Sequence, residues 1–114
     1  PGSMRRKTAP AKARKLLGQA TQAGSAPEAL DLLSRALGGL VSDLSLSSTP
    51  SLTALEAHAA LKRLGVEEGL ASEIRSILES CDEARYAPGT RAALKDLLLR
   101  SEQTVDGLSR WRRS

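Results

Sequence analysis

The most reactive side chains of this chain lie close together, in the segment 80–89. This segment holds Cys81, the only cysteine, and Tyr86, the only tyrosine, beside the acids Asp82 and Glu83. A nucleophilic cysteine needs a thiolate, which a nearby base, a cation or a helix N-terminus stabilises. Cys81 instead lies on the apolar face of an expected helix, near its C-terminus, where the helix dipole opposes a thiolate. We therefore interpret Cys81 as a small buried core residue.

Asp82 and Glu83 are the nearest approach to a pair of catalytic carboxylates, but neighbouring helix positions point about 100° apart. They do not share a face as a dyad would, and we interpret both as solvated. His58 is the only histidine. It has Glu56 nearby in sequence but no partner at a clear triad spacing, and one histidine with one cysteine does not form a zinc site. The sequence therefore predicts a non-enzymatic protein with no catalytic residue, no metal site and no cofactor.

Arg85 and Tyr86 are the remaining candidates in the segment. Arg85 precedes the expected end of the helix, where a cation interacts favourably with the helix dipole. Tyr86 is amphipathic and allows two interpretations. In the one we favour, Tyr86 closes the core where two helices meet, in a packed corner with Pro88 and Gly89. In the other, Arg85 and Tyr86 form a partner surface, which is the functional hypothesis for this segment.

The composition describes a single globular domain with an aliphatic core. The chain has 114 residues, of which 40% are hydrophobic and 26% charged, and it contains no phenylalanine. A chain of this length supports one core, and that core must be built from leucine, alanine, isoleucine and valine. No apolar run is long enough to cross a bilayer, and no secretory signal is present.

Positive charge is concentrated at the two ends of the sequence. The formal net charge is +4, and no acidic residue occurs before Glu28. Two interpretations remain open, a pair of solvated tails or a surface for nucleic acid or anionic lipid. The candidate membrane-proximal cluster is Arg5, Arg6 and Lys7, and the C-terminal arginines are Arg110, Arg112 and Arg113.

Apolar residues recur every three or four positions, and no stretch alternates as a strand would. The sequence therefore predicts an all-α fold, a small bundle of four to five helices with a single core and no sheet. We expect an expression-tag remnant at 1–3, a basic, partly helical segment at 4–24, a helical bundle at 25–110 and a basic tail with Trp111 at 111–114. The helix in 4–24 is expected to fray, to begin near Pro10 and to end before Gly24.

Several local signals fix the expected helix ends. Ser25 or Ala26 precedes Pro27 at the start of the second helix. Thr53 and Glu56 form a capping box, Gly65 is placed to end the same helix in a left-handed conformation, and Thr90 caps the last helix. Inside the second helix, Gly38-Gly39 predicts either a close helix crossing or a kink.

Three stretches of the sequence carry a family resemblance. They are Leu52-Thr53-Ala54-Leu55-Glu56, Leu61-Lys62-Arg63-Leu64-Gly65-Val66 and Ile77-Leu78-Glu79-Ser80-Cys81-Asp82-Glu83-Ala84-Arg85-Tyr86-Ala87-Pro88-Gly89. Together they resemble the C-terminal cytoplasmic domain of BatD-type oxygen-tolerance proteins, over roughly 27–108. The run from Cys81 to Pro88 is the specific part of the resemblance.

The resemblance implies a small helical tail that follows an extracytoplasmic β-rich region and a membrane span. BatD-like proteins accompany von Willebrand-type domain proteins and MoxR-type AAA+ ATPases in bacterial envelope systems linked to oxidative stress and aerotolerance. A protein of this kind would be a cytoplasmic domain of an inner-membrane protein. Arg5, Arg6 and Lys7 would then lie just inside the membrane, against anionic lipid.

Two functional hypotheses follow. The first is a non-enzymatic protein-interaction module that binds a MoxR-type ATPase or a von Willebrand-type domain protein. The second is a small basic nucleic-acid-binding helical domain. The second is less favoured, because a recognition helix presents its N-terminal end to the major groove and the expected fourth helix begins with Glu67 and Glu68.

Overall fold

Five helices make up almost all of the described chain. The computed structural model describes residues 2–86 and 89–113, and these ranges contain no strand. The helices are α1 (Gly2–Thr21), α2 (Ala26–Ser45), α3 (Ala54–Arg63), α4 (Glu68–Tyr86) and α5 (Arg91–Arg113). The prediction of a small all-α bundle is confirmed.

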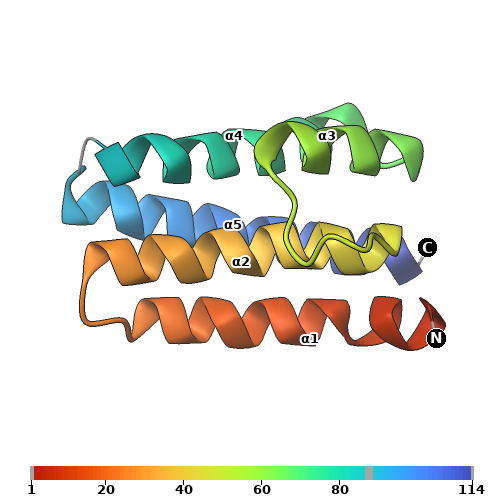
Figure 1. Cartoon of the computed structure of the whole chain (residues 1–114), viewed down its shortest axis with the longest axis horizontal. Helices are drawn as coiled ribbons and strands as arrows, with labels where there is room; N and C mark the ends of the chain where they lie inside the picture. The colour runs from red at the N-terminus through yellow and green to blue at the C-terminus, as the bar shows by residue number, and fades with distance from the viewer. Residues whose placement is uncertain (1, 87–88, 114) are drawn as a thin grey trace.

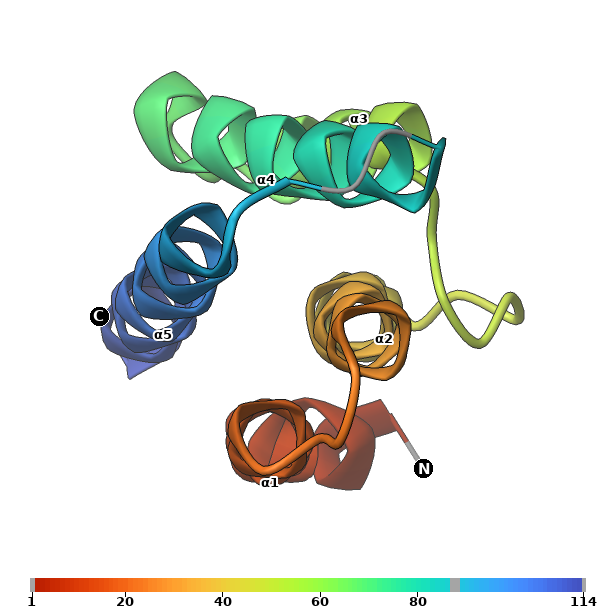
Figure 2. The same cartoon turned by 90° about the vertical axis from the view of Figure 1, so that its left-hand side faces the viewer.

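The helices are arranged around α2, which contacts each of the other four. Figure 1 shows α1 and α2 as an antiparallel pair, with α3 and α4 on the opposite side of α2. Seen along the bundle in Figure 2, α5 lies beside α4, and it also contacts α1. All five helices contribute to one core, including Leu17, Leu37, Leu61, Ile74 and Leu108.

The basic segment at 4–24 is helical along most of its length and shares this core. Apart from Pro10, the buried positions of α1 are Ala9, Ala13, Leu17 and Ala20, spaced by four, four and three residues. Alanine gives a weak hydrophobic signal in the sequence, and this explains why the sequence predicted a frayed helix here. The expected end before Gly24 is confirmed.

The prediction that the first helix begins near Pro10 is wrong, because α1 begins earlier and Pro10 lies inside it. Proline has no N–H to donate to the carbonyl four residues earlier, so an interior proline bends or interrupts a helix. Figure 2 shows the first turns of α1 off the axis of the rest of the helix. Pro10 is buried against the bundle, and packing therefore holds a helix that propensity alone would end.

Gly38 allows the connector between α2 and α3 to lie against α2. Helix α2 runs through Gly38 and Gly39 without a break, and of the two predicted alternatives the close approach is found, although to this connector rather than to another helix. A Cβ at Gly38 would stand 2.8 Å from the carbonyl oxygen of Leu52. The Leu52 amide donates to the Gly38 carbonyl at 3.2 Å, and the Ser42 hydroxyl donates to the Thr49 carbonyl.

The predicted helix ends are confirmed where local chemistry sets them. The Ser25 hydroxyl accepts from the Glu28 amide, and Thr53 with Glu56 forms the capping box. Gly65 has φ 88, and the Thr90 hydroxyl accepts from the Ala93 amide at 3.0 Å.

Trp111, expected in a basic tail at 111–114, instead belongs to the last turns of α5. Helix α5 continues to Arg113. The Trp111 side chain is half-buried and packs against the core. The apolar stripe of α5 therefore extends beyond Leu108, its last leucine.

Candidate functional site

The predicted partner surface lies where α4 ends, at one end of the bundle (Figure 1). Tyr86 is the last residue of α4, and 90% of its side chain is exposed. The favoured interpretation, that Tyr86 closes the core in a packed corner, is therefore wrong. At 100° per residue, Tyr86 stands about 140° from the buried Cys81, so the helical period points it away from the core. Of the other two expected corner residues, Gly89 lines the cavity described below, and Pro88 lies outside the described residues.

Arg85 links α4 to α2 through its side chain, which remains exposed to solvent. Its guanidinium donates to the Ser34 hydroxyl at 3.4 Å and lies 4.0 Å from the carboxylate of Asp31. The predicted position of this cation in the last turn of α4 is confirmed. Ser34 and Asp31 were not expected as partners, because nothing local in the sequence links residues about fifty positions apart.

An apolar cavity of about 160 Å³ opens beside Arg85, and we call it the corner cavity. It lies between the start of α2, the end of α4 and the start of α5. Tyr86, which was expected to fill this corner, is not among its lining residues. An apolar cavity of this size accommodates a small aliphatic side chain. Its apolar lining includes Pro27, Leu30, Ala84, Ala93, Leu94 and Leu97.

The other residues of this segment take the places predicted for them. Cys81 is fully buried. Burial raises the pKa of its thiol, although a hydrogen bond with Ser34 acts in the opposite direction. Asp82 and Glu83 are both exposed. Among the described residues of this segment, Cys81 is therefore not an activated nucleophile, and Asp82 and Glu83 do not form a buried carboxylate dyad.

His58 lies in a network of charged side chains between α3 and α4. Its Nε2 is 2.9 Å from Glu68 Oε1, and its Nδ1 is 3.2 Å from the guanidinium of Arg75. Because arginine only donates, His58 Nδ1 accepts from Arg75, and His58 Nε2 carries the hydrogen and donates it in a hydrogen bond to Glu68 Oε1. Glu56, the neighbour noted in the sequence, bonds to Thr53 instead.

Glu68 is the centre of this network. Hydrogen bonds from Lys62, Ser72 and His58 lower the pKa of Glu68 from 4.5 to about 2. The Ser72 hydroxyl donates to Glu68 at 2.7 Å, so serine and histidine share one acceptor rather than forming a relay. The network holds α3 against α4 and has the connectivity of a structural ion-pair cluster.

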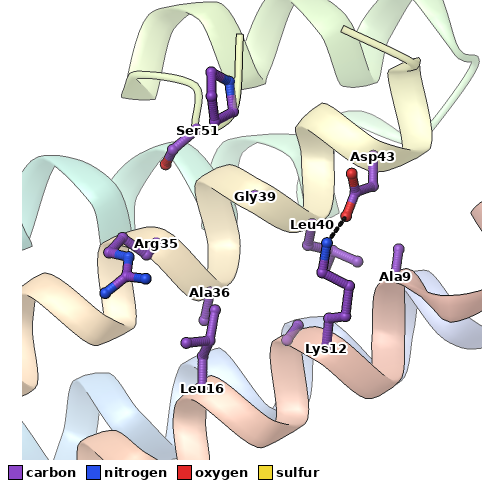
Figure 3. Close-up of a pocket in the computed structure, with 11 residues that line it drawn as sticks. Ala9, Lys12, Leu16, Arg35, Ala36, Gly39, Leu40, Asp43 and Ser51 are labelled. Atoms are coloured by element: carbon purple, nitrogen blue, oxygen red, sulfur yellow. Dashed lines mark hydrogen bonds and ion pairs between the residues drawn. The ribbon is translucent and has the colours of Figure 1, made fainter. Parts of the chain in front are cut away.

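A second cavity, of about 340 Å³, lies between α1, α2 and the connector that follows α2. Figure 3 shows Lys12 extending from α1 toward Asp43 on α2, with the nitrogen and oxygen 3.4 Å apart. Leu16 and Ala36 line its apolar side, and Arg35 lies at its edge. This cavity could not be predicted from the sequence, because residues from three separate segments form it.

Arg5 and Arg6 have partners inside the molecule. Arg5 lies 3.1 Å from Asp43 and donates to the Ser47 carbonyl at 2.9 Å, and Arg6 donates to the Leu44 carbonyl at 2.9 Å. Both arginines therefore cap the C-terminal end of α2, where free carbonyls and the helix dipole attract cations. Lys7 is exposed. A membrane-proximal role for these three residues stays a prediction.

Within residues 2–86 and 89–113, no three histidine, cysteine or acidic side chains are grouped closely enough to hold a metal ion. The helices of the described chain are too short or too polar to span a membrane. Comparisons with protein-family models, with curated proteins and with solved structures find no match to this chain.

Proposed function

We propose that this chain is a non-enzymatic protein-interaction module, and that its partner binds at the corner formed by Arg85, Tyr86 and the corner cavity. One observation carries the proposal: the only tyrosine of the chain is 90% exposed at the end of α4. Tyrosine and arginine are enriched among the residues that dominate binding energy at protein interfaces.

The surroundings of Tyr86 support a partner with both an apolar and an acidic group. The corner cavity provides an apolar recess of about 160 Å³, and Arg85 provides a guanidinium at its edge. Such a recess with a cation at its edge suits a partner segment with an aliphatic side chain followed by a carboxylate.

The resemblance to BatD-type proteins suggests which partners to try. We propose a MoxR-type AAA+ ATPase or a von Willebrand-type domain protein, with this chain as the cytoplasmic helical domain of an inner-membrane protein linked to aerotolerance. This identity rests on the residue runs of the sequence, above all the run from Cys81 to Pro88.

The test is binding of the purified chain to these two candidate partners, measured by calorimetry. Tyr86→Ala is expected to weaken binding by about thirtyfold, as a hot-spot residue does. Its free energy of unfolding should change by less than about 0.5 kcal/mol, because the side chain is exposed. Leu99→Ala is the matched control, since it removes an exposed apolar side chain from the middle of α5.

Two results would count against the proposal. One is that neither candidate partner binds the wild-type chain at micromolar concentration. The other is that Tyr86→Ala and Leu99→Ala bind equally well, which would place the interface elsewhere on the bundle.

A further inference from the structure

The two basic ends of the sequence lie at the same end of the folded bundle. Helix α1 starts and helix α5 finishes at this end, opposite the turn between α4 and α5 (Figure 1). Figure 2, turned by 90°, agrees, since both termini lie at the far end from the viewer. Fold topology therefore joins two charge clusters that are about a hundred residues apart in the sequence.

Several cations at this end are accessible to a partner. Lys7 on α1 and Arg110 and Arg112 on α5 are all exposed. Arg63, the last residue of α3, is exposed as well. We call this set, together with the α2-capping Arg5 and Arg6, the basic end.

The acidic residues near the basic end are mostly engaged in ion pairs. Asp43 is paired with both Arg5 and Lys12, and Glu68 is paired with Lys62 and accepts a hydrogen bond from His58. Helix α1 contains no acidic residue at all. Glu67 and the ion-paired Glu68 are the exposed acids named here, and the cations of this end outnumber them, so positive charge dominates this surface.

Exposed aliphatic side chains accompany these cations. Met4, in the first turns of α1, is 59% exposed, and Leu46, which follows α2, is 39% exposed. A surface that combines cations with exposed aliphatic groups suits the boundary between anionic headgroups and acyl chains. Single-stranded nucleic acid is bound instead on stacking aromatic side chains, and the one tryptophan here, Trp111, is packed against the core.

We propose that the basic end docks on an anionic lipid surface, with Met4 and Leu46 entering the headgroup layer. The long axis of the bundle measures 37 Å. Docking by this end points the opposite end, with Arg85 and Tyr86, away from the lipid. The membrane contact and the proposed protein contact therefore use separate surfaces. Each of the two proposals can be tested, and can be contradicted, independently of the other.

The test is sedimentation of the whole chain with vesicles. Vesicles that contain phosphatidylglycerol should bind the chain, vesicles of phosphatidylcholine alone should not, and added salt should weaken binding. Each basic residue near an anionic surface is worth about fivefold in affinity. The double substitution Lys7→Gln with Arg110→Gln should therefore weaken binding by about twenty-five-fold.

The matched control is the double substitution Arg91→Gln with Lys95→Gln. It removes the same charge from exposed positions at the other end of α5, and it should change vesicle affinity by less than about threefold. A second pair tests the aliphatic contact: Met4→Ser should weaken binding, whereas Leu99→Ser should not. Circular dichroism confirms that each variant is folded.

Three outcomes would overturn the proposal. The first is no sedimentation with phosphatidylglycerol vesicles at low salt. The second is equal loss of binding in the two charge variants, which would show that only net charge matters. The third is binding of a random-sequence DNA oligonucleotide, without vesicle binding, under the same conditions, which would assign the basic end to nucleic acid.

Discussion

Arg100 on α5 and Glu73 on α4 form a two-pronged ion pair that joins the last two helices. Arg100 Nε donates to Glu73 Oε2 at 3.0 Å, and Arg100 Nη2 donates to Glu73 Oε1 at 2.8 Å. The hydrogen bond from Arg100 lowers the pKa of Glu73. The pair is partly buried, so water screens it less than a fully exposed contact.

Breaking this pair should destabilise the fold. We expect Glu73→Gln to lower the free energy of unfolding by about 1 kcal/mol, at the upper end of the range for accessible ion pairs, because its geometry is bidentate. Urea denaturation measures the change. The control is Glu79→Gln, which removes a single contact of 3.5 Å between Glu79 and Arg75 one turn apart and should cost no more than about 0.5 kcal/mol. Equal losses in the two variants would contradict the special role of Arg100.

Alanine at the two neighbouring glycines of α2 should have opposite effects. At Gly38 a Cβ would stand 2.8 Å from the Leu52 carbonyl oxygen, so Gly38→Ala must displace the connector and should cost about 1 to 3 kcal/mol. At Gly39 the nearest atom is the Pro50 carbonyl oxygen at 3.7 Å, an ordinary contact. Gly39→Ala should therefore stabilise the helix by up to about 1 kcal/mol. Thermal unfolding of both variants decides this, and stabilisation by Gly38→Ala would contradict the close approach.

Local chemistry made much of the fold predictable. The Thr53–Glu56 capping box and the left-handed Gly65 depend on residues at most three positions apart, and the burial of Cys81 follows from helical spacing. Tyr86 was predictable by the same rule, since it lies about 140° around the helix from Cys81. Its amphipathic ring, which can close a core where two helices meet, favoured a core role instead, and that interpretation was wrong.

The features that sequence reasoning missed all depend on tertiary placement. Arg5 meets Asp43 across 38 positions of sequence, and the corner cavity collects residues from three helices. To predict that the two basic ends of the sequence meet, one would likewise need to know the direction of every helix from α1 to α5. No local pattern encodes these distances.

Leu46 adopts a conformation that suits glycine better. It follows α2 with φ 56 and ψ 40, in the left-handed region, where a Cβ costs on the order of 1 kcal/mol. We expect Leu46→Gly to raise the free energy of unfolding by about 1 kcal/mol. Leu99→Gly, at an exposed position inside α5, should lower it by a similar amount. Chemical denaturation of the two variants tests the contrast, and a loss in both would mean that Leu46 contributes more through packing than it costs in strain.

Stability should fall as acid protonates Glu68. Hydrogen bonds lower its pKa from 4.5 to about 2 in the folded state, so between these values the unfolded chain binds more protons. The contribution of Glu68 is therefore complete above about pH 4.5 and is lost as the pH falls toward 2. Denaturation of the wild type and of Glu68→Gln at pH 6 and at pH 3 tests this. The variant should lose less stability between the two pH values, and an identical loss would show that the network around His58 does not stabilise the fold.

Cys81 should react with thiol reagents only when the core opens. Its side chain is fully buried, and burial raises the pKa of the thiol, so both access and thiolate formation are suppressed in the folded state. We expect its reaction with an aromatic disulfide reagent at pH 8 to be more than about a hundredfold slower than in urea. The control is Asp82→Cys in a Cys81→Ala background, which moves the thiol one position to an exposed site and should react at the rate of a free thiol. Rapid reaction of Cys81 in the native protein would place it at an accessible surface and reopen the question of a reactive cysteine at the end of α4.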